Sequence, residues 1–116
     1  MDIYHIWCDL RPGASDVEFA DACSTYLSTL RDRGEAAGFR ITRRKLGLGA
    51  PGLGELHIMI EFTSLAQLDE AFNSVSSRAE PIESFHFAVN RHVTNVTFAL
   101  YRDFPDPNRK IGEEKF

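Results

Sequence analysis

The sequence is short of cysteine and of long apolar runs. Its two cysteines, Cys8 and Cys23, lie in apolar surroundings, without CxxC spacing and without a Cys/His cluster around them. They are therefore predicted to be reduced core thiols rather than part of a disulfide framework or a redox motif. No apolar stretch approaches the roughly 20 residues that span a bilayer, and the chain starts with a strand pattern rather than a leader. We expect a cytoplasmic protein with no membrane partner.

The chain also lacks an excess of positive charge. Thirteen Lys and Arg face seventeen Asp and Glu, which gives a net charge of -4 and argues against a nucleic-acid partner. At 116 residues, with 43% hydrophobic and 26% charged residues, the chain has the length and composition of one globular domain. We expect this domain over residues 1–104 and a surface tail over residues 105–116.

The first half of the chain alternates between strand and helix patterns. Residues 2–10 alternate polar and apolar side chains, which predicts a strand. Ser15 followed by Glu18 forms a capping box that starts a helix ending near Gly34. Alternation returns over residues 39–46, which predicts a second strand.

The second half begins with a glycine-rich loop over residues 47–54, which the pattern favours as a hairpin or dimer-contact loop over an anion site. A third strand follows at once and ends at Phe62. A second helix begins at the capping box of Ser64 and Gln67 and ends near Arg78. The Pro-led residues 81–89 favour a short helix over a strand, and residues 93–102 form the last strand.

The order strand, helix, strand, strand, helix, strand predicts an α+β fold of ferredoxin-like type. Its two right-handed crossovers place both helices on the same side of a four-stranded antiparallel sheet. The other side of the sheet is then left without a covering layer, and we call it the bare face. Side-chain alternation assigns twelve residues to the bare face: His5, Trp7, Asp9, Arg40, Thr42, Arg44, His57, Met59, Glu61, Asn95, Thr97 and Tyr101.

The pairing of strands on the bare face can be anticipated in part. The hairpin of the second and third strands is expected to place opposite charges across from each other. The expected pairs are Arg40 with Glu61, Thr42 with Met59, and Arg44 with His57. The first and third strands are expected to be parallel neighbours, which would bring His5 and His57 together across the same face.

The composition of the bare face predicts a homodimer. Trp7, Met59 and Tyr101 make it too apolar for ordinary surface, whereas its histidines, arginines and carboxylates make it too polar for a dry core. Large exposed apolar patches are rare on monomers, so a second copy of the chain is the expected cover.

Four segments carry a resemblance to known proteins. The "YHIW" first strand, the "ELHIMIEF" third strand and the Pro-led segment before "VTFALYRDF" are similar to the dimeric α/β-barrel superfamily. This superfamily includes stress-responsive A/B barrel proteins and small cofactor-free monooxygenases and cyclases. The longer runs "TRRKLGLGAPGLGELHIMIEF" and "HVTNVTFALYRDFPDP" resemble a family of uncharacterised bacterial proteins over nearly the whole chain. The resemblance implies two sheets packed face to face around a cavity, without a cofactor.

The histidines of the bare face are candidates for acid/base chemistry. His5 and His57 could form a general acid/base pair, oriented by a carboxylate such as Glu61 or Asp9. The favoured interpretation is that both are hydrogen-bonded interior or interface histidines that fill the barrel. Two histidines and a carboxylate can also bind a metal, but no spacing in this sequence enforces such a site, so none is predicted.

Further site residues come from the resemblance and from the same face. Some enzymes of the superfamily use a histidine in the Pro-led segment, where this chain has Glu83 and, about a turn later, His86. The expected function is the binding of a small molecule inside the barrel or a stress-related role. The alternatives are a cofactor-independent monooxygenase, cyclase or isomerase that uses His5, His57 and His86, and a purely structural dimer. The residues expected to contact the ligand are Trp7, Asp9, Arg44, Met59, Glu61, Thr97 and Tyr101.

Overall fold

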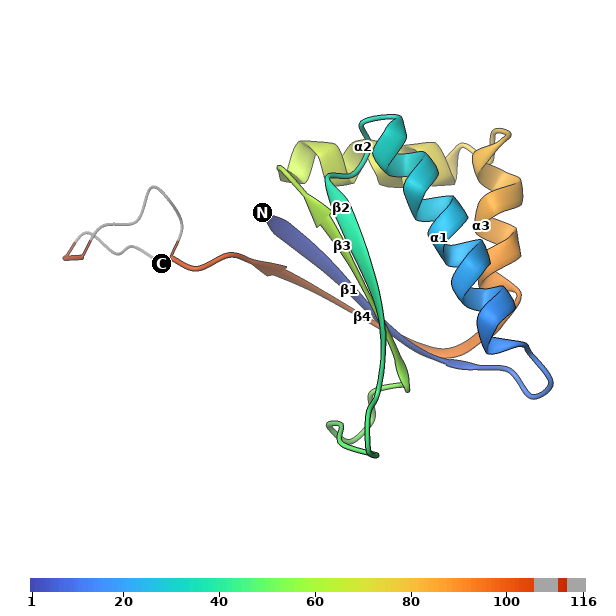
Figure 1. The fold of residues 1–116 in the computed structure, drawn as a ribbon. Coiled ribbons are helices and arrows are strands. Elements are labelled where there is room, and N and C mark those ends of the chain that lie inside the picture. Colours follow the sequence, from blue (N-terminus) through green and yellow to red (C-terminus); the bar gives the residue numbers. More distant parts are fainter. Residues whose placement is uncertain (106–110, 113–116) are drawn as a thin grey trace.

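The computed structural model describes residues 1–105 and 111–112. Most of the tail expected over residues 105–116 lies outside the described residues. The elements follow in the order β1 (Asp2–Leu10), α1 (Asp16–Asp32), β2 (Gly38–Arg43), β3 (Leu56–Phe62), α2 (Leu65–Ser76), α3 (Ile82–Asn90) and β4 (Val93–Arg102). The helices α1 and α3 lie along one face of the sheet, and α2 lies across one end of it (Figure 1).

The four strands form one sheet in the order β2-β3-β1-β4, and every neighbouring pair is antiparallel. This confirms the expected α+β, ferredoxin-like arrangement. The expectation that the first and third strands are parallel is wrong. Because a hairpin joins β2 to β3 and the crossover makes β2 parallel to β1, the strand inserted between them must run opposite to both.

The register of the β2–β3 hairpin differs from the expected one by two residues. Glu61 lies opposite Gly38, Met59 opposite Arg40, and His57 opposite Thr42. A shift by an even number of residues leaves every side chain on its predicted face, because the side-chain period of a strand is two. The expected charge pairing of Arg40 with Glu61 is nevertheless lost.

Arg44 lies outside the sheet, since β2 ends one residue earlier. Its backbone N–H donates to the Glu55 carbonyl at 2.8 Å, and its guanidinium donates to the Leu53 carbonyl at 2.6 Å. The side chain therefore braces the β2–β3 loop. The expected pairing of Arg44 with His57 is replaced by these contacts within the loop.

The helix boundaries follow the capping residues. The Ser15 hydroxyl accepts from the Glu18 N–H, and the Ser64 hydroxyl accepts from the Gln67 N–H, both at 3.2 Å. These bonds satisfy N–H groups that the first helical turn leaves unpaired. Residues 82–90 form the favoured short helix rather than a strand, and its Ile82 is buried in the core.

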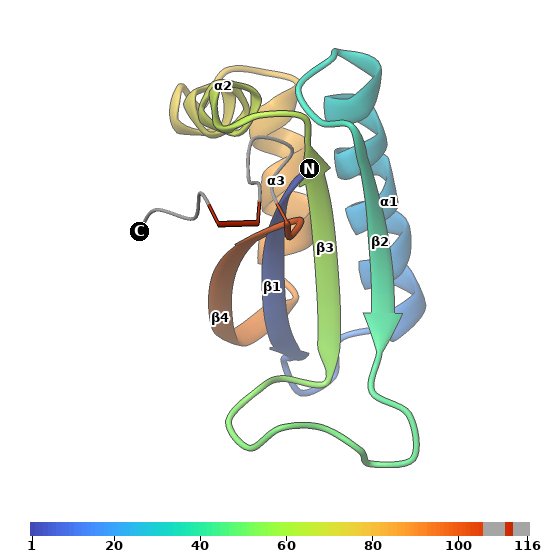
Figure 2. The ribbon, with the colours of Figure 1, turned by 90° about the vertical axis from the view of Figure 1, so that its left-hand side faces the viewer.

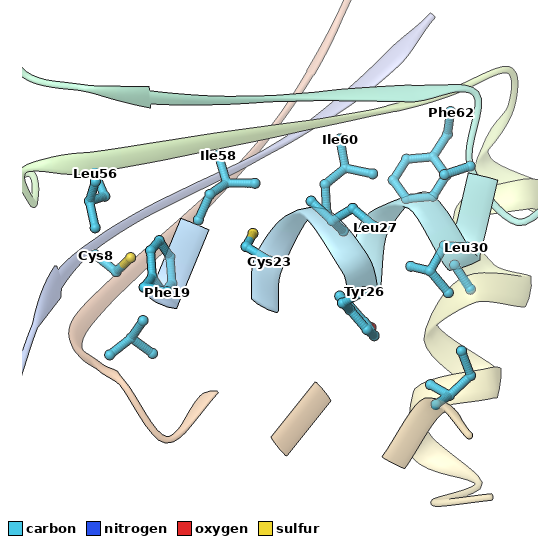
Figure 3. Close-up of a cluster of buried hydrophobic side chains, with 14 residues drawn as sticks. Cys8, Phe19, Cys23, Tyr26, Leu27, Leu30, Leu56, Ile58, Ile60 and Phe62 are labelled. Carbon is cyan, nitrogen blue, oxygen red and sulfur yellow. The ribbon is translucent and has the colours of Figure 1, made fainter. Parts of the chain in front are cut away.

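The core lies between the sheet and the helices (Figure 3). Side chains of β1 and β3 face the apolar stripe of α1, where Phe19, Cys23, Leu27 and Leu30 are buried. Burial of a large apolar side chain contributes about 1.5–3 kcal/mol, so this layer holds the sheet and α1 together. Cys8 belongs to the same cluster, as predicted from its position on β1.

Among residues 1–105 and 111–112, no helix or strand covers the opposite face of the sheet (Figure 2). The strand β4 is also an edge strand, and its apolar residues on the helix side remain exposed, as Phe98 and Leu100 illustrate. In residues 1–105 and 111–112, no helix has the length and hydropathy needed to cross a membrane.

Candidate ligand cavity and histidine cluster

A cavity of about 380 Å³ lies between the sheet and the helices. Its walls are mainly aliphatic and aromatic side chains from β1, β3, α1, α2, α3 and β4. Among the described residues, no Asp, Glu, Lys or Arg side chain lines it. The volume and the apolar lining of the cavity fall in the range of small-molecule sites.

Tyr26 of α1 and His86 of α3 bring polar groups into this apolar cavity. Their ring centroids are 5.8 Å apart and their planes are tilted by 57°. Asn90, one turn after His86, also lines the cavity. A tyrosine hydroxyl, an imidazole and an amide together can donate to and accept from one polar group of a ligand.

Burial keeps the Tyr26 hydroxyl protonated. It raises the pKa of Tyr26 to about 12, and the negative charge of Glu35 adds to this effect. A neutral phenol is a hydrogen-bond donor at physiological pH. Tyr26 is therefore suited to hold a ligand oxygen rather than to act as a base.

Glu35 is a buried carboxylate just after α1, and its charge acts on Tyr26. One of its oxygens, Oε1, accepts from the Ser74 hydroxyl at 2.9 Å and pairs with Arg33 at 3.2 Å. The other oxygen, Oε2, is buried and has no hydrogen-bond partner among the described residues. A buried polar atom without a partner lowers the stability of the fold, and Oε2 can still accept a hydrogen bond.

The two cysteines line the same cavity as free thiols. Burial raises the pKa of Cys8 to about 11 and that of Cys23 to about 12. A cysteine acts as a nucleophile or a metal ligand in its thiolate form. At these pKa values very little thiolate is present at neutral pH. Both residues therefore act as apolar wall.

The open side of the cavity lies at the β4 edge. Tyr4 stacks on Phe98 at a centroid distance of 5.8 Å and meets Phe72 edge-on at 5.3 Å. All three residues line the cavity, and Phe72 and Phe98 are exposed to solvent. These aromatic rings form the rim through which a ligand can enter, and we call them the aromatic rim.

A second cluster lies on the bare face. His5 Nδ1 and His57 Nε2 are 2.9 Å apart, so one imidazole donates to the other. Trp7 stacks on His57 at 4.4 Å with an interplanar angle of 11°, and the Tyr101 ring meets His5 edge-on at 5.1 Å. The structure thus brings together four residues that the sequence placed on this face.

Both imidazoles of this cluster favour the neutral state. Burial lowers the pKa of His5, and burial together with the neighbouring His5 lowers the pKa of His57. At neutral pH the pair shares one N–H···N hydrogen bond and carries no charge. A neutral pair is compatible with an enclosed interface.

The carboxylate expected to orient these histidines is engaged elsewhere. Asp9 accepts from the Glu55 N–H at 2.9 Å and from the Asn95 amide at 3.2 Å, and these bonds lower its pKa. Glu61 pairs with Ile3 on β1, two positions from His5. No carboxylate–histidine hydrogen bond occurs among the described residues, so the two histidines orient each other.

Of the remaining bare-face residues, Arg44 lies outside the sheet and Asn95 lies at a register shift of β4, while the others lie where alternation placed them. Met59 is opposite His5, and Thr97 is opposite Trp7. In the part of the chain that the structure describes, no three His, Cys, Asp or Glu residues come together in a way that could hold a metal ion.

Comparisons with known proteins give the family. The model of DUF6614, a family of unknown function, matches residues 1–116. The chain belongs to this family. No curated protein matches the sequence significantly.

Solved structures similar to this DUF6614 chain share its fold. A crystal structure of an Arabidopsis thaliana protein matches with a TM-score of 0.70 and 12% identity, covering 91% of this chain and 98% of that one. SnoaB, a cofactor-independent oxygenase from Streptomyces nogalater, matches with a TM-score of 0.69 and 7% identity, covering 93% and 97%. A dimeric ferredoxin-like protein of unknown function from Jannaschia matches with a TM-score of 0.64 and 11% identity, covering 89% and 100%. At such identities the likeness shows the fold.

The geometry separates the candidate residues of the DUF6614 chain into two sites. His86 lies in the cavity beneath the helices, whereas His5 and His57 lie on the opposite face of the sheet. Sequence reasoning missed Tyr26 as a cavity residue, because its place in the apolar stripe of α1 made it look like core. Asn90 was missed as well, although a polar residue at the end of an apolar helix face was a usable signal.

Proposed function

We propose that this chain is a homodimer that binds a small, uncharged, predominantly apolar molecule inside each protomer. The observation that carries the proposal is the cavity of about 380 Å³ with apolar walls and no charged lining among the described residues. A charged ligand buried there would be left without a counter-charge, which is costly in an apolar environment. An aromatic or alicyclic ligand meets no such penalty.

The polar groups that line the cavity define one more property of the ligand. Tyr26, His86 and Asn90 offer hydroxyl, imidazole and amide groups in a mainly apolar space, to which Ser76 adds a second hydroxyl. A ligand with one carbonyl, hydroxyl or enol group satisfies them and gains orientation from them. A pure hydrocarbon would leave these groups unpaired and bind less well.

The homodimer is proposed from the bare face. Trp7, His5, His57 and Tyr101 form an aromatic layer there, and no helix or strand of the described residues covers it. Aromatic residues are enriched at interfaces, and the neutral histidine pair avoids the cost of burying charge. A protein of the same fold from Jannaschia is described as dimeric, which supports the same assembly here.

Binding is tested with a neutral fluorescent probe, 1-aminoanthracene. The wild-type protein is expected to enhance its fluorescence with saturation at one probe per protomer. The variant Val89→Phe fills the cavity and is expected to lose the enhancement. The matched variant Val17→Phe makes the same change at an exposed position of α1 outside the cavity and is expected to keep it. Equal binding by both variants would place the probe elsewhere and refute the cavity as the site.

A second candidate function is proton-transfer catalysis without a cofactor. The observation that favours it is the contact of His86 with Tyr26 inside the cavity, where an imidazole can serve as base and a phenol as hydrogen-bond donor. The similar structure of SnoaB, described as a cofactor-independent oxygenase, is consistent with such chemistry on this fold.

The enzyme hypothesis is tested on molecules that co-purify with the native protein. These are identified by mass spectrometry and incubated with fresh protein in air, and their conversion is followed by chromatography. Conversion is expected with wild type and with His5→Gln, and is expected to be lost with His86→Gln. Loss with His5→Gln or His57→Gln but not with His86→Gln would move the chemistry to the bare face, as the sequence analysis proposed.

A further inference from the structure

The loop between β2 and β3 projects from the sheet and is held by hydrogen bonds within the loop. We call residues 44–55 the arm; it extends beyond the end of the sheet, away from α1 and α3 (Figures 1 and 2). The two Arg44 bonds to Glu55 and Leu53 close its base, and the Leu48 N–H donates to the Lys45 carbonyl at 3.0 Å. These internal bonds give the arm a defined shape.

The arm presents two leucines to solvent. Leu46 is 83% exposed and Leu48 is 77% exposed. Leu46 also has a positive φ of 56°, a conformation that is unfavourable for a residue with a Cβ. Neither leucine is buried against the described residues, so the tip of the arm presents apolar surface that a partner could cover.

An apolar surface of matching character lies on β4. Phe98 is 58% exposed and Leu100 is 51% exposed, and both point to the helix side of the sheet, opposite Ile6 and Tyr4. Phe98 belongs to the aromatic rim. Whatever covers this row of β4 therefore also covers the entrance of the cavity.

We propose that the arm of each protomer packs its leucines over Phe98 and Leu100 of the other protomer and thereby closes the other protomer's cavity. This inference rests on the proposed homodimer and assigns the partner copy a part in the ligand site. In a twofold dimer such a contact occurs twice, because each protomer contributes one arm and one β4. The arm and the β4 row then bury each other's exposed side chains in both directions.

Charge at the ends of the two surfaces fits this contact. The base of the arm holds Lys45, whereas the neighbouring Arg43 pairs with Asp16 and Glu55 and Arg44 bonds within the arm. The carboxylate of Asp103, which follows β4 directly, is exposed and pairs with the N-terminal ammonium at 3.1 Å. Lys45 has no ion-pair partner within the described residues. A cation approaching Asp103 of the partner adds attraction and helps to set the register of the contact.

Site-directed cross-linking tests the contact. Leu48→Cys and Leu100→Cys chains are co-expressed with different affinity tags and treated with a short bismaleimide. We expect a cross-link that joins the two differently tagged chains. Val17→Cys in place of Leu100→Cys is the control, because this exposed position lies on α1; Cys8 and Cys23 are buried and stay unreactive. A dimer in ultracentrifugation without this cross-link refutes the arm contact, whereas a monomer refutes the proposed homodimer as well.

Probe release tests the closure. In the double variant Leu46→Ser/Leu48→Ser, 1-aminoanthracene is expected to dissociate about tenfold faster, the factor that corresponds to about 1.4 kcal/mol of lost contact. The bare face is unchanged in this variant, so the dimer is expected to persist. An unchanged release rate from an intact dimer refutes closure by the arm. Failure of wild type to bind the probe at all would instead count against the proposed function.

Discussion

His5 Nδ1 lies 2.9 Å from His57 Nε2 on an uncovered face of the sheet, and the two rings belong to antiparallel neighbouring strands. The two nitrogens share one proton in an N–H···N hydrogen bond. This bond forms only when at least one of the two rings is neutral, because the accepting nitrogen must be unprotonated. A sheet face that is too aromatic for solvent thus carries a polar centre that is uncharged at neutral pH and becomes charged in acid.

The first prediction concerns the pH dependence of stability. Burial lowers the pKa of both His5 and His57 below the ordinary value of 6.5 in the folded state. The folded state therefore binds fewer protons than the unfolded state, and the stabilisation is complete above pH 6.5 and lost as pH falls through the lowered pKa values. Unfolding by urea at a series of pH values checks this. The double variant His5→Gln/His57→Gln is expected to show a flatter profile, and an identical profile would contradict the assignment.

The second prediction concerns the core under α1. Leu27 is buried and lines the cavity, so Leu27→Ala enlarges a space that already exists and is expected to cost about 2–5 kcal/mol of unfolding free energy. Val17→Ala on the exposed side of the same helix is expected to stay within about 0.5 kcal/mol of wild type. Equal losses for both variants, measured by chemical denaturation, would contradict the described core.

The third prediction concerns Gly54 at the end of the arm. A Cβ on this residue would meet the backbone C, O and N atoms of Cys8 at 2.4, 2.5 and 2.7 Å. Backbone atoms of a central strand cannot move aside cheaply, so Gly54→Ala is expected to destabilise the fold or separate β3 from β1. Gly52→Ala meets no atom within 4 Å and changes only a residue with a positive φ of 83°. It is expected to cost about 1 kcal/mol, which thermal unfolding of the two variants would compare.

The fourth prediction concerns Glu35 and Tyr26. Burial and the charge of Glu35 raise the pKa of Tyr26 to about 12, so removing that charge in Glu35→Gln is expected to lower the pKa of Tyr26 while burial keeps it above the ordinary value of 10. Ultraviolet titration of the tyrosinate band measures this shift, and Tyr26→Phe identifies which step belongs to Tyr26. An unchanged step in Glu35→Gln would mean that the carboxylate does not reach the hydroxyl.

Much of this architecture could be predicted from alternation and capping. The strand over residues 2–10 has the predicted limits, and the capping residues Ser15 and Ser64 mark the starts of α1 and α2. Such signals are local, because they depend on a period of two or on one hydroxyl and one N–H. The parity of the bare face follows from them except at Arg44, which lies outside the sheet, and at the register shift of β4, where Thr94 rather than Asn95 lies opposite Asp9.

Longer-range features could not be predicted in the same way. The hairpin register depends on where β2 ends, and Arg44 ends it early by bonding within the arm. The parallel arrangement expected for β1 and β3 was wrong because strand direction is a property of the whole topology rather than of either strand.

The cavity lies between the sheet and the helices, where the sequence predicts a filled core. The sequence analysis expected a ligand on the bare face, since that is where polar and aromatic residues gather. The pattern of apolar residues on the helix side predicts a hydrophobic core. Periodicity does not indicate whether the side chains of that core fill the space between the layers. His86 was proposed on resemblance alone, and the structure places it in this space beside Tyr26.

The strand β4 has one further consequence. Its alternate residues belong to two different surfaces: Phe98 edges the cavity, while Thr97 and Tyr101 face the other way, beside Trp7 and Ile3. A molecule that moves this strand from one side necessarily moves it on the other. In the proposed dimer, ligand binding in the cavity and subunit association would then be linked equilibria, and each would change the other by the same factor.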